Sequence, residues 1–260
     1  MKPVYALTAL LLLQPVITQA ETAQEKGLAI AVEGDRRDTG FDDFTVSLSM
    51  LLTNKHGEES LRHMRNKTLE GVGDGDKTMI VFDRPRDVKG TALLTYTHKE
   101  GPDDQWLYLP ALKRVKRIAS RNKSGPFMGS EFAYEDFASQ EVEKYTYEYV
   151  KDDVYEGKEV FVNMRDPVDK YSGYSYQLLW VDKQEYIPHK IEFYDRKKSL
   201  LKTLIFENYQ QYLDQYWRAE KMHMENHQTG KKTTLTWSDY KFRTGLKESN
   251  FSKNSLKRAK

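Results

Sequence analysis

The most distinctive stretch of this 260-residue chain is Asp104–Phe137, DQWLYLPALKRVKRIASRNKSGPFMGSEFAYEDF. It begins with large side chains at alternate positions, Trp106, Tyr108 and Pro110, a spacing typical of a β-strand. A basic run follows, and the stretch ends in a loop that two glycines interrupt. The loop carries the apolar side chains Phe127, Met128, Phe132, Tyr134 and Phe137. Because such side chains are rarely left in water as a group, the loop predicts a contact with the core, a lid or a ligand.

On both sides of this stretch, apolar and polar residues alternate with the period of two that marks strands with one apolar face. Phe44, Val46, Leu48 and Met50, for example, alternate with Thr and Ser. The pattern continues from residue 44 to residue 109 and again from residue 143 to residue 242, and it predicts about eleven short strands. The connections are short, which favours antiparallel pairing. An antiparallel sheet of this size should curl to cover its own apolar face.

One segment before the strands has a helical pattern. Residues 23–38 place Leu28, Ile30 and Ala31 on one stripe, and Gly40 follows as a stop signal. We expect this helix to cover one end of the sheet, with the glycine-flanked loop as a second covering element. The basic tail, residues 253–260, is expected to be frayed.

The N-terminus has the composition of a secretory signal peptide. Lys2 precedes the apolar stretch 4–16, and Thr18-Gln19-Ala20 offers small residues for cleavage. We expect cleavage after Ala20 and a single domain over residues 21–260. The chain contains no Cys, so the sequence predicts neither a disulfide nor a lipid-modified cysteine. A net charge of +2 gives no global field for nucleic acid, and no nucleic-acid partner is expected.

The stretch 104–137 resembles the signature of the LolA-like family of periplasmic outer-membrane lipoprotein-sorting proteins. The resemblance rests on Trp106-x-Tyr108-x-Pro110, the basic run 113–117 and the segment 127–136, with Glu131 where the family usually has Asp. It implies an all-β dominated, incomplete and strongly curved β-barrel, here of about eleven strands, with helices covering the opening. It also implies a periplasmic location and a lipid or acylated lipoprotein as cargo. An inner-membrane lipid exporter and an outer-membrane acceptor are the partners that the resemblance suggests.

No pattern in the chain predicts an enzyme. A nucleophile elbow, a phosphate-binding loop and a dinucleotide fingerprint are all absent from the sequence. Residues 71–76 combine glycines with acids but lack the spacing of a calcium loop. His223 and His227 would lie roughly 13 Å apart along a strand, too far to share a metal. His189 has no evident partner in the sequence. We therefore expect no catalytic residue, no metal and no cofactor.

The ligand hypothesis rests on apolar surface. Burying an acyl chain away from water is favourable by roughly 0.8 kcal/mol per methylene, or on the order of 12 kcal/mol for sixteen carbons. A soluble carrier must provide an apolar surface that supplies this free energy. A curved barrel can supply a cavity for such a chain if its inward residues leave space. The same side chains filling an ordinary core are the alternative. The residues expected to line the cavity or its mouth are Phe44, Val46, Leu48, Trp106, Tyr108, Phe127, Met128 and Phe132.

Three functional hypotheses follow. The first is a non-enzymatic periplasmic carrier, opened by the glycine-flanked loop, that shields the acyl chains of a lipid or lipoprotein between the inner and outer membranes. The second is a non-carrier accessory subunit that docks an inner-membrane lipid exporter. A hydrolase is the third, although no triad or metal site supports it. In the first two, the basic run would contact anionic head groups or an acidic protein patch. The alternative is that it serves only solubility at the rim of the barrel. Its candidate partner-binding residues are Lys113, Arg114, Lys116 and Arg117.

Overall fold

The computed structural model describes residues 20–259 of the chain. The predicted signal peptide, apart from Ala20, therefore lies outside the described residues. The strands are β1 (Asp43–Thr53), β2 (Glu59–Leu69), β3 (Lys77–Arg84), β4 (Ala92–Tyr96), β5 (Asp104–Leu109), β6 (Arg114–Ile118), β7 (Tyr145–Tyr155), β8 (Lys158–Pro167), β9 (Tyr174–Asp182), β10 (Pro188–Asp195), β11 (Leu200–Tyr212), β12 (Tyr216–Asn226) and β13 (Lys232–Phe242).

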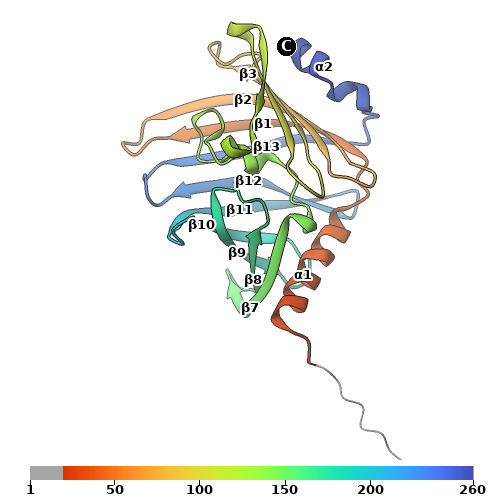
Figure 1. The fold of residues 1–260 in the computed structure, drawn as a ribbon, viewed down its shortest axis with the longest axis vertical. Helices are drawn as coiled ribbons and strands as arrows, with labels where there is room; N and C mark the ends of the chain where they lie inside the picture. The colour runs from red at the N-terminus through yellow and green to blue at the C-terminus, as the bar shows by residue number, and fades with distance from the viewer. Residues whose placement is uncertain (1–19, 260) are drawn as a thin grey trace, which may run out of the picture.

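All of these strands belong to one antiparallel sheet. Its order is β6-β5-β4-β3-β2-β1-β13-β12-β11-β10-β9-β8-β7. The sheet curves strongly and does not close on itself, since β6 and β7 remain as edges (Figure 1). The predicted fold, an incomplete and strongly curved barrel, is confirmed, with thirteen strands rather than about eleven. One strand that the sequence pattern did not reveal is β6, because the basic run leaves it only Val115 and Ile118 as apolar members.

The helices are few and most of them are short. They are the α-helices α1 (Ala23–Asp38) and α2 (Lys253–Arg258) and the 3₁₀ helices η1 (Pro110–Leu112), η2 (Ser120–Asn122), η3 (Phe127–Gly129), η4 (Tyr134–Phe137), η5 (Val142–Lys144) and η6 (Glu248–Phe251). The bounds of α1 are those predicted. Thr22 begins it, because its hydroxyl accepts a 3.1 Å hydrogen bond from Glu25 N while the Glu25 carboxylate accepts one of 2.8 Å from Thr22 N.

The sheet buries apolar side chains on both faces. The inner face carries the main core, with Met50, Phe82 and Phe127 fully buried. The outer face of β3–β5 is covered by α2 (Figure 1), where Leu256 and Phe251 pack against Trp106. The prediction of a frayed C-terminus is therefore wrong over 253–258, since these two apolar side chains are enough to fix the short helix.

The topology determines the path of the chain between β6 and β7. β6 and β7 follow one another in the sequence but lie at opposite edges of the sheet. Residues 119–144, which we call the crossing segment, must therefore run from one edge to the other on the inner side of the curve (Figure 1). The segment consists mainly of short 3₁₀ turns, η2 to η5.

α1 packs directly against β7, at the edge of the sheet opposite β6. A Cβ atom added to Gly27 would lie 2.7 Å from the backbone nitrogen of Tyr149 in β7, closer than real Cβ atoms approach. The Gly27 carbonyl also accepts a 2.9 Å hydrogen bond from the buried Asn163 side chain of β8. Gly27 is therefore a close contact between the helix and the sheet.

We predict that Gly27→Ala destabilises the protein, although the same change in a free helix is stabilising by about 1 kcal/mol. The added methyl meets backbone atoms that cannot move aside, and overpacking of this kind costs about 1–3 kcal/mol. Urea unfolding measures the effect. Val32→Ala, at a half-exposed position of α1, is the matched control and should change the free energy of unfolding by less than about 1 kcal/mol. A gain in stability for Gly27→Ala would contradict the close contact.

Candidate functional site

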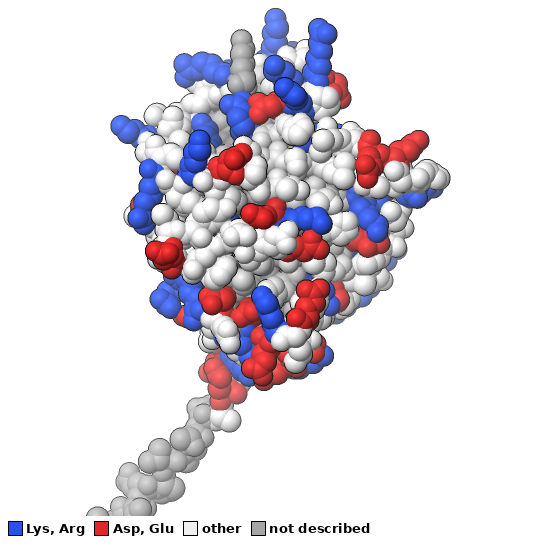
Figure 2. Space-filling view, turned by 180° about the vertical axis from the view of Figure 1, so that it is seen from behind, with Lys and Arg blue, Asp and Glu red and all other residues white. Residues whose placement is uncertain are grey.

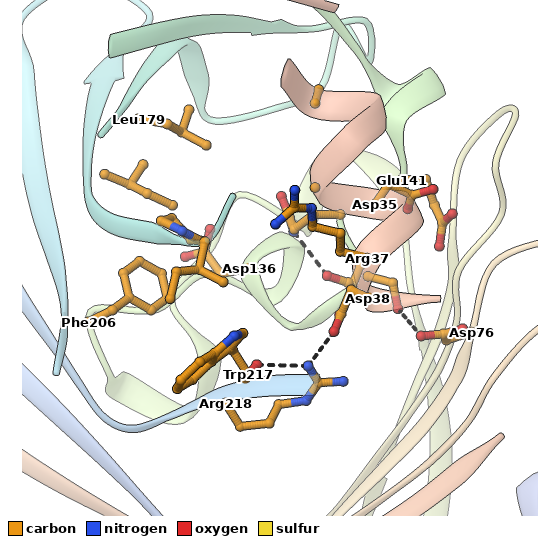
Figure 3. A pocket seen from close by; sticks show the side chains of 18 of the residues that line it. Asp35, Arg37, Asp38, Asp76, Asp136, Glu141, Leu179, Phe206, Trp217 and Arg218 are labelled. Carbon is orange, nitrogen blue, oxygen red and sulfur yellow. Dashed lines mark hydrogen bonds and ion pairs between the residues drawn. The ribbon is translucent and has the colours of Figure 1, made fainter. Parts of the chain in front are cut away.

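A large cavity opens on the inner side of the sheet. Its volume is about 600 Å³, within the roughly 300–1,000 Å³ typical of small-molecule sites. α1, the inner faces of β1–β3 and β8–β13, and the end of the crossing segment surround it (Figure 3). The cavity therefore lies where the sheet is not filled by its own side chains.

The sheet provides an apolar wall. Five neighbouring strands each contribute two residues spaced by two, so that both point to the inner face. Phe206 and Leu179 lie together on this wall (Figure 3). The five pairs are Leu179 and Val181, Ile191 and Phe193, Leu204 and Phe206, Met222 and Met224, and Leu235 and Trp237.

The opposite side, along α1, is polar. Asp35, Arg37 and Asp38 come from α1, and Asp76 and Glu141 lie close to them (Figure 3). Asp38 pairs with Arg218 of β12, which ties the end of the helix to the sheet. Burial raises the pKa of the Asp38 carboxyl, which Arg218 only partly offsets. The cavity thus has one apolar wall and one acidic side.

The Arg218 guanidinium lies in an aromatic cluster. It lies within 6 Å of the ring centroids of Phe41, Phe44, Tyr216 and Phe242, at 5.6, 5.8, 5.9 and 5.8 Å. At this range cation–π attraction adds to the ion pair with Asp38. These contacts hold the C-terminal end of α1 at the rim of the cavity.

The crossing segment is anchored by a buried ion pair. The ammonium of Lys202, on β11, donates hydrogen bonds of 2.8 Å to the Asp136 carboxylate and 2.9 Å to the Glu131 carbonyl. Asp136 also accepts a 2.8 Å hydrogen bond from the Tyr174 hydroxyl and one of 2.7 Å from Ala133 N. The Lys202 side chain is 4% exposed, so the pair is almost removed from water. Breaking such a pair is costly, because one charge would be left buried alone.

Further hydrogen bonds hold the segment to both halves of the sheet. The Glu131 carboxylate accepts a 2.7 Å bond from Asn226 of β12, and Glu131 N donates one of 2.9 Å to Thr233 of β13. On the other half, Gln105 of β5 donates a 2.8 Å bond to the Tyr134 carbonyl, and Arg62 of β2 donates to the Met128 carbonyl. The segment is therefore a fixed floor of the cavity rather than a free flap.

The predicted ligand-binding residues fall in four different places in the structure. Phe44 and Phe132 line the cavity. Leu48, Phe127 and the partly buried Met128 belong to the inner core beside it. Val46 is buried with 4% of its surface exposed. Trp106 and Tyr108 instead lie on the outer face under α2, because they occupy the strand positions that alternate with the inward Leu107.

The basic run is exposed. Lys113, Arg114, Lys116 and Arg117 all reach solvent on or beside the edge strand β6. Arg117 is engaged, since its Nε donates a 3.1 Å hydrogen bond to Asp104. The other three have no ion pair within residues 20–259 and are available to a partner.

The sequence analysis missed most of the cavity wall. The inward residues of β9–β13 follow the same alternation of apolar and polar residues that identified Phe44. That alternation could have predicted them. Lys202 and Asn226 bind the side chains of Asp136 and Glu131, but no pattern in the sequence around Lys202 or Asn226 predicts these contacts. His189 also has a partner that the sequence did not reveal, because its Nε2 lies 3.1 Å from the Asp182 carboxylate.

Two further searches of residues 20–259 gave negative results. No group of three or more His, Cys, Asp or Glu side chains there is arranged to hold a metal ion. Among the helices of the same residues, none is long and apolar enough to cross a membrane.

Comparison with known proteins places this geometry in a family. A family model described as "Uncharacterized protein" matches residues 74–258, and no curated protein matches the chain. A crystal structure named as an outer membrane lipoprotein-sorting protein domain, from Vibrio parahaemolyticus, is 60% identical, with a TM-score of 0.89 over 90% of this chain and 100% of that one. A DUF1329 family protein from Desulfovibrio piger is 30% identical, with a TM-score of 0.85 over 90% and 99%. A LolA superfamily protein from Nitrosomonas europaea, 23% identical, shares the fold with a TM-score of 0.72 over 91% and 100%.

We predict that Lys202→Met lowers the free energy of unfolding by about 3–5 kcal/mol, because Asp136 and the Glu131 carbonyl lose their buried partner. Chemical denaturation measures the change. Lys221→Met removes an ion pair whose side chains are both 42% exposed, and this control should cost less than about 1 kcal/mol. The double variant Lys202→Met/Asp136→Leu should recover part of the loss. Equal stabilities for Lys202→Met and Lys221→Met would show that the pair is not an anchor.

Proposed function

Because the chain belongs to the LolA-like family of outer-membrane lipoprotein-sorting proteins, we propose that it is a carrier for acyl chains in the periplasm. It would shield the chains of a lipid or acylated lipoprotein between an inner-membrane exporter and an outer-membrane acceptor. The predicted signal peptide accounts for export, and residues 21–260 act as one carrier domain. The process needs no cofactor and breaks no covalent bond.

The apolar wall is the observation that carries this proposal. Ten inward side chains from five adjacent strands leave about 600 Å³ unfilled, whereas a core-forming sheet would fill that space. Hiding a sixteen-carbon chain is worth on the order of 12 kcal/mol, and an apolar surface of this extent is what can supply it. Met222 and Met224 suit the task, since methionine adapts its shape to different chains.

The anchored crossing segment changes the expected opening mechanism. A loop held by a buried ion pair and by bonds to both halves of the sheet is a poor gate. α1 is the better candidate, because it covers the polar side of the cavity and the Asp38 side chain that pairs its end with Arg218 is 55% exposed, whereas the Lys202–Asp136 pair is buried. We propose that α1 moves to admit cargo while the crossing segment stays in place.

The exposed basic residues are the proposed contact with a membrane or a transporter. Lys113 and Arg114 lie at the tip of the β5–β6 hairpin beside Leu112, which is 62% exposed. The β3–β4 turn lies next to this tip, since a Cβ on Gly90 would be 3.3 Å from Pro110. That turn adds the exposed Arg84, Arg86 and Lys89. Lys and Arg gather at this end of the molecule (Figure 2).

The first test of the carrier is lipid extraction from the purified protein followed by mass spectrometry. We predict a bound amphiphile in the native protein and its loss from Leu179→Glu and Phe206→Glu, because a charge in the apolar wall disfavours an acyl chain. Val154→Glu, at a position of β7 that is 65% exposed, is the matched control and should keep the lipid. A protein that is free of lipid from several hosts would instead support the accessory subunit.

The second test concerns the basic tip. We predict that the triple variant Lys113→Glu/Arg114→Glu/Lys116→Glu binds vesicles containing phosphatidylglycerol at least about tenfold more weakly, at roughly 1 kcal/mol per charge near the surface. Vesicle sedimentation at low and high salt measures this. The variant Lys197→Glu/Lys198→Glu/Lys231→Glu changes the same charge at exposed turns of β10–β11 and β12–β13. If both variants lose binding equally, net charge rather than the basic tip is responsible.

A further inference from the structure

The acidic side of the cavity is built from separate parts of the chain. Asp35 and Asp38 come from α1, Asp76 from the residue before β3, and Glu141 from the crossing segment (Figure 3). They lie close enough to disfavour one another's charge, since Asp76 and Asp35 both raise the pKa of Glu141. Placing several carboxylates close together costs free energy, because their negative charges repel one another. We therefore asked which group offsets the charge of each carboxylate.

Two of these carboxylates are accounted for within the protein. Asp38 pairs with Arg218. Asp76 accepts hydrogen bonds of 3.0 Å from Gly71 N and 3.0 Å from the Ser139 hydroxyl. Neither is left without a partner.

Glu141 differs from them. It is 8% exposed and lines the cavity, yet its carboxylate has no hydrogen bond or ion pair among residues 20–259. Burial, with repulsion from Asp76 next, raises its pKa to about 7. The Asp35 carboxylate also has no hydrogen bond or ion pair within the described chain, but Asp35 is exposed to solvent, and partial burial raises its pKa. These two carboxylates face one another from the crossing segment and from α1 (Figure 3).

Two amides provide an independent observation. Asn66 of β2 and Asn163 of β8 line the same cavity and are 6% and 3% exposed. Each leaves its side-chain oxygen without a hydrogen-bond partner. Buried oxygens of this kind are rarely left unpaired. Like Glu141 and Asp35, these oxygens are acceptors, and together they outnumber Trp237 Nε1, an unpaired buried donor that lines the same cavity.

The cations around the cavity do not satisfy these acceptors. Arg218 is paired with Asp38, Arg165 donates to Gln177 and Gln140, and Arg37 donates to Glu33. Lys99 lowers the pKa of both Asp35 and Glu141 through its charge but makes no ion pair with either. Glu143, an exposed residue in the middle of η5, adds a further negative charge. The acidic side of the cavity therefore has more negative charge and more hydrogen-bond acceptors than the neighbouring cations satisfy. A positively charged group with several donors would complement it.

We propose that this acidic side, centred on Asp35 and Glu141, binds the ammonium group of an amine-bearing lipid whose acyl chain lies on the apolar wall. A primary ammonium has three donors, no acceptor and a positive charge, which is the complement of the oxygens present. The inference rests on the proposed carrier function and names the chemical class of its cargo. Lys99 is then available to the phosphate that accompanies the amine in a phospholipid.

The test compares two lysophospholipids with the same acyl chain, lysophosphatidylethanolamine and lysophosphatidylglycerol, below their micelle concentrations. Fluorescence of Trp217 and Trp237, which line the cavity, reports binding. We expect the ethanolamine lipid to bind at least about tenfold more tightly, the usual effect of one charge-assisted hydrogen bond. Its advantage should grow between about pH 5 and pH 8, as Glu141 becomes charged.

Glu141→Gln and Asp35→Asn should each remove most of this preference while leaving the glycerol lipid's affinity within about twofold. Glu143→Gln makes the same charge change two residues away but outside the cavity lining, and it should keep most of the preference. Unfolding is not a confounding outcome for Glu141→Gln, since removing a carboxylate whose charged form is disfavoured by burial should not destabilise the fold. Equal binding of both lipids, unchanged by Glu141→Gln, would overturn the ammonium site but leave the carrier standing. No binding of either lipid would count against the carrier itself.

Discussion

The buried pair between Lys202 and Asp136 is the interaction on which the rest of this structure depends. The chain places consecutive strands, β6 and β7, at opposite edges of one open sheet, so the segment between them must cross the inner side. A crossing made of short 3₁₀ turns has little regular hydrogen bonding of its own, and its polar groups need partners from the sheet. Lys202, Tyr174, Asn226 and Thr233 supply them from four different strands. The signature residues Glu131 and Asp136 are therefore structural anchors that fix the floor of the cavity.

The same arrangement explains why a cavity remains. The aromatic side chains of the crossing segment pack on the β3 side, where Phe127 lies 5.7 Å from Phe82 and 4.5 Å from Phe137 between ring centroids. They fill that half of the curve, and the unfilled space lies toward the inner faces of β9–β13. α1 cannot sink onto those strands, because Gly27 is already in contact with the backbone of β7 and Arg218 holds its other end at the rim. The sheet, the floor and the helix thus enclose space that none of them fills.

Much of this fold was predictable, because most of it follows from alternation along single strands. The bounds of α1 and the curling of the sheet were predicted from local patterns, and the open barrel from the family resemblance of one short stretch. What could not be predicted depends on pairing between distant segments. Asp136 and Lys202 are 66 residues apart, and nothing near either one identifies the other. Trp106 and Tyr108 have the right residue types for a ligand wall, but only the position of α2 shows that they belong to the outer face.

If the protein is the carrier proposed above, it must also release its cargo, and the asymmetry of the cavity bears on how it could do so. An entirely apolar cavity would favour an acyl chain by roughly 0.8 kcal/mol per methylene, and a long chain would then leave very slowly. The acidic side reduces the apolar surface that an acyl chain can contact. Its unpaired carboxylates also destabilise the empty cavity, because burial disfavours their charged form. A cargo that neutralises these groups gains affinity at its head rather than along its chain. Affinity located at the head group can be lost when α1 moves Asp35 and Asp38 away from Glu141, whereas affinity spread along the apolar wall cannot. The acidic side would therefore couple the position of α1 to the retention of cargo, and the anchored crossing segment would keep the wall unchanged while this happens.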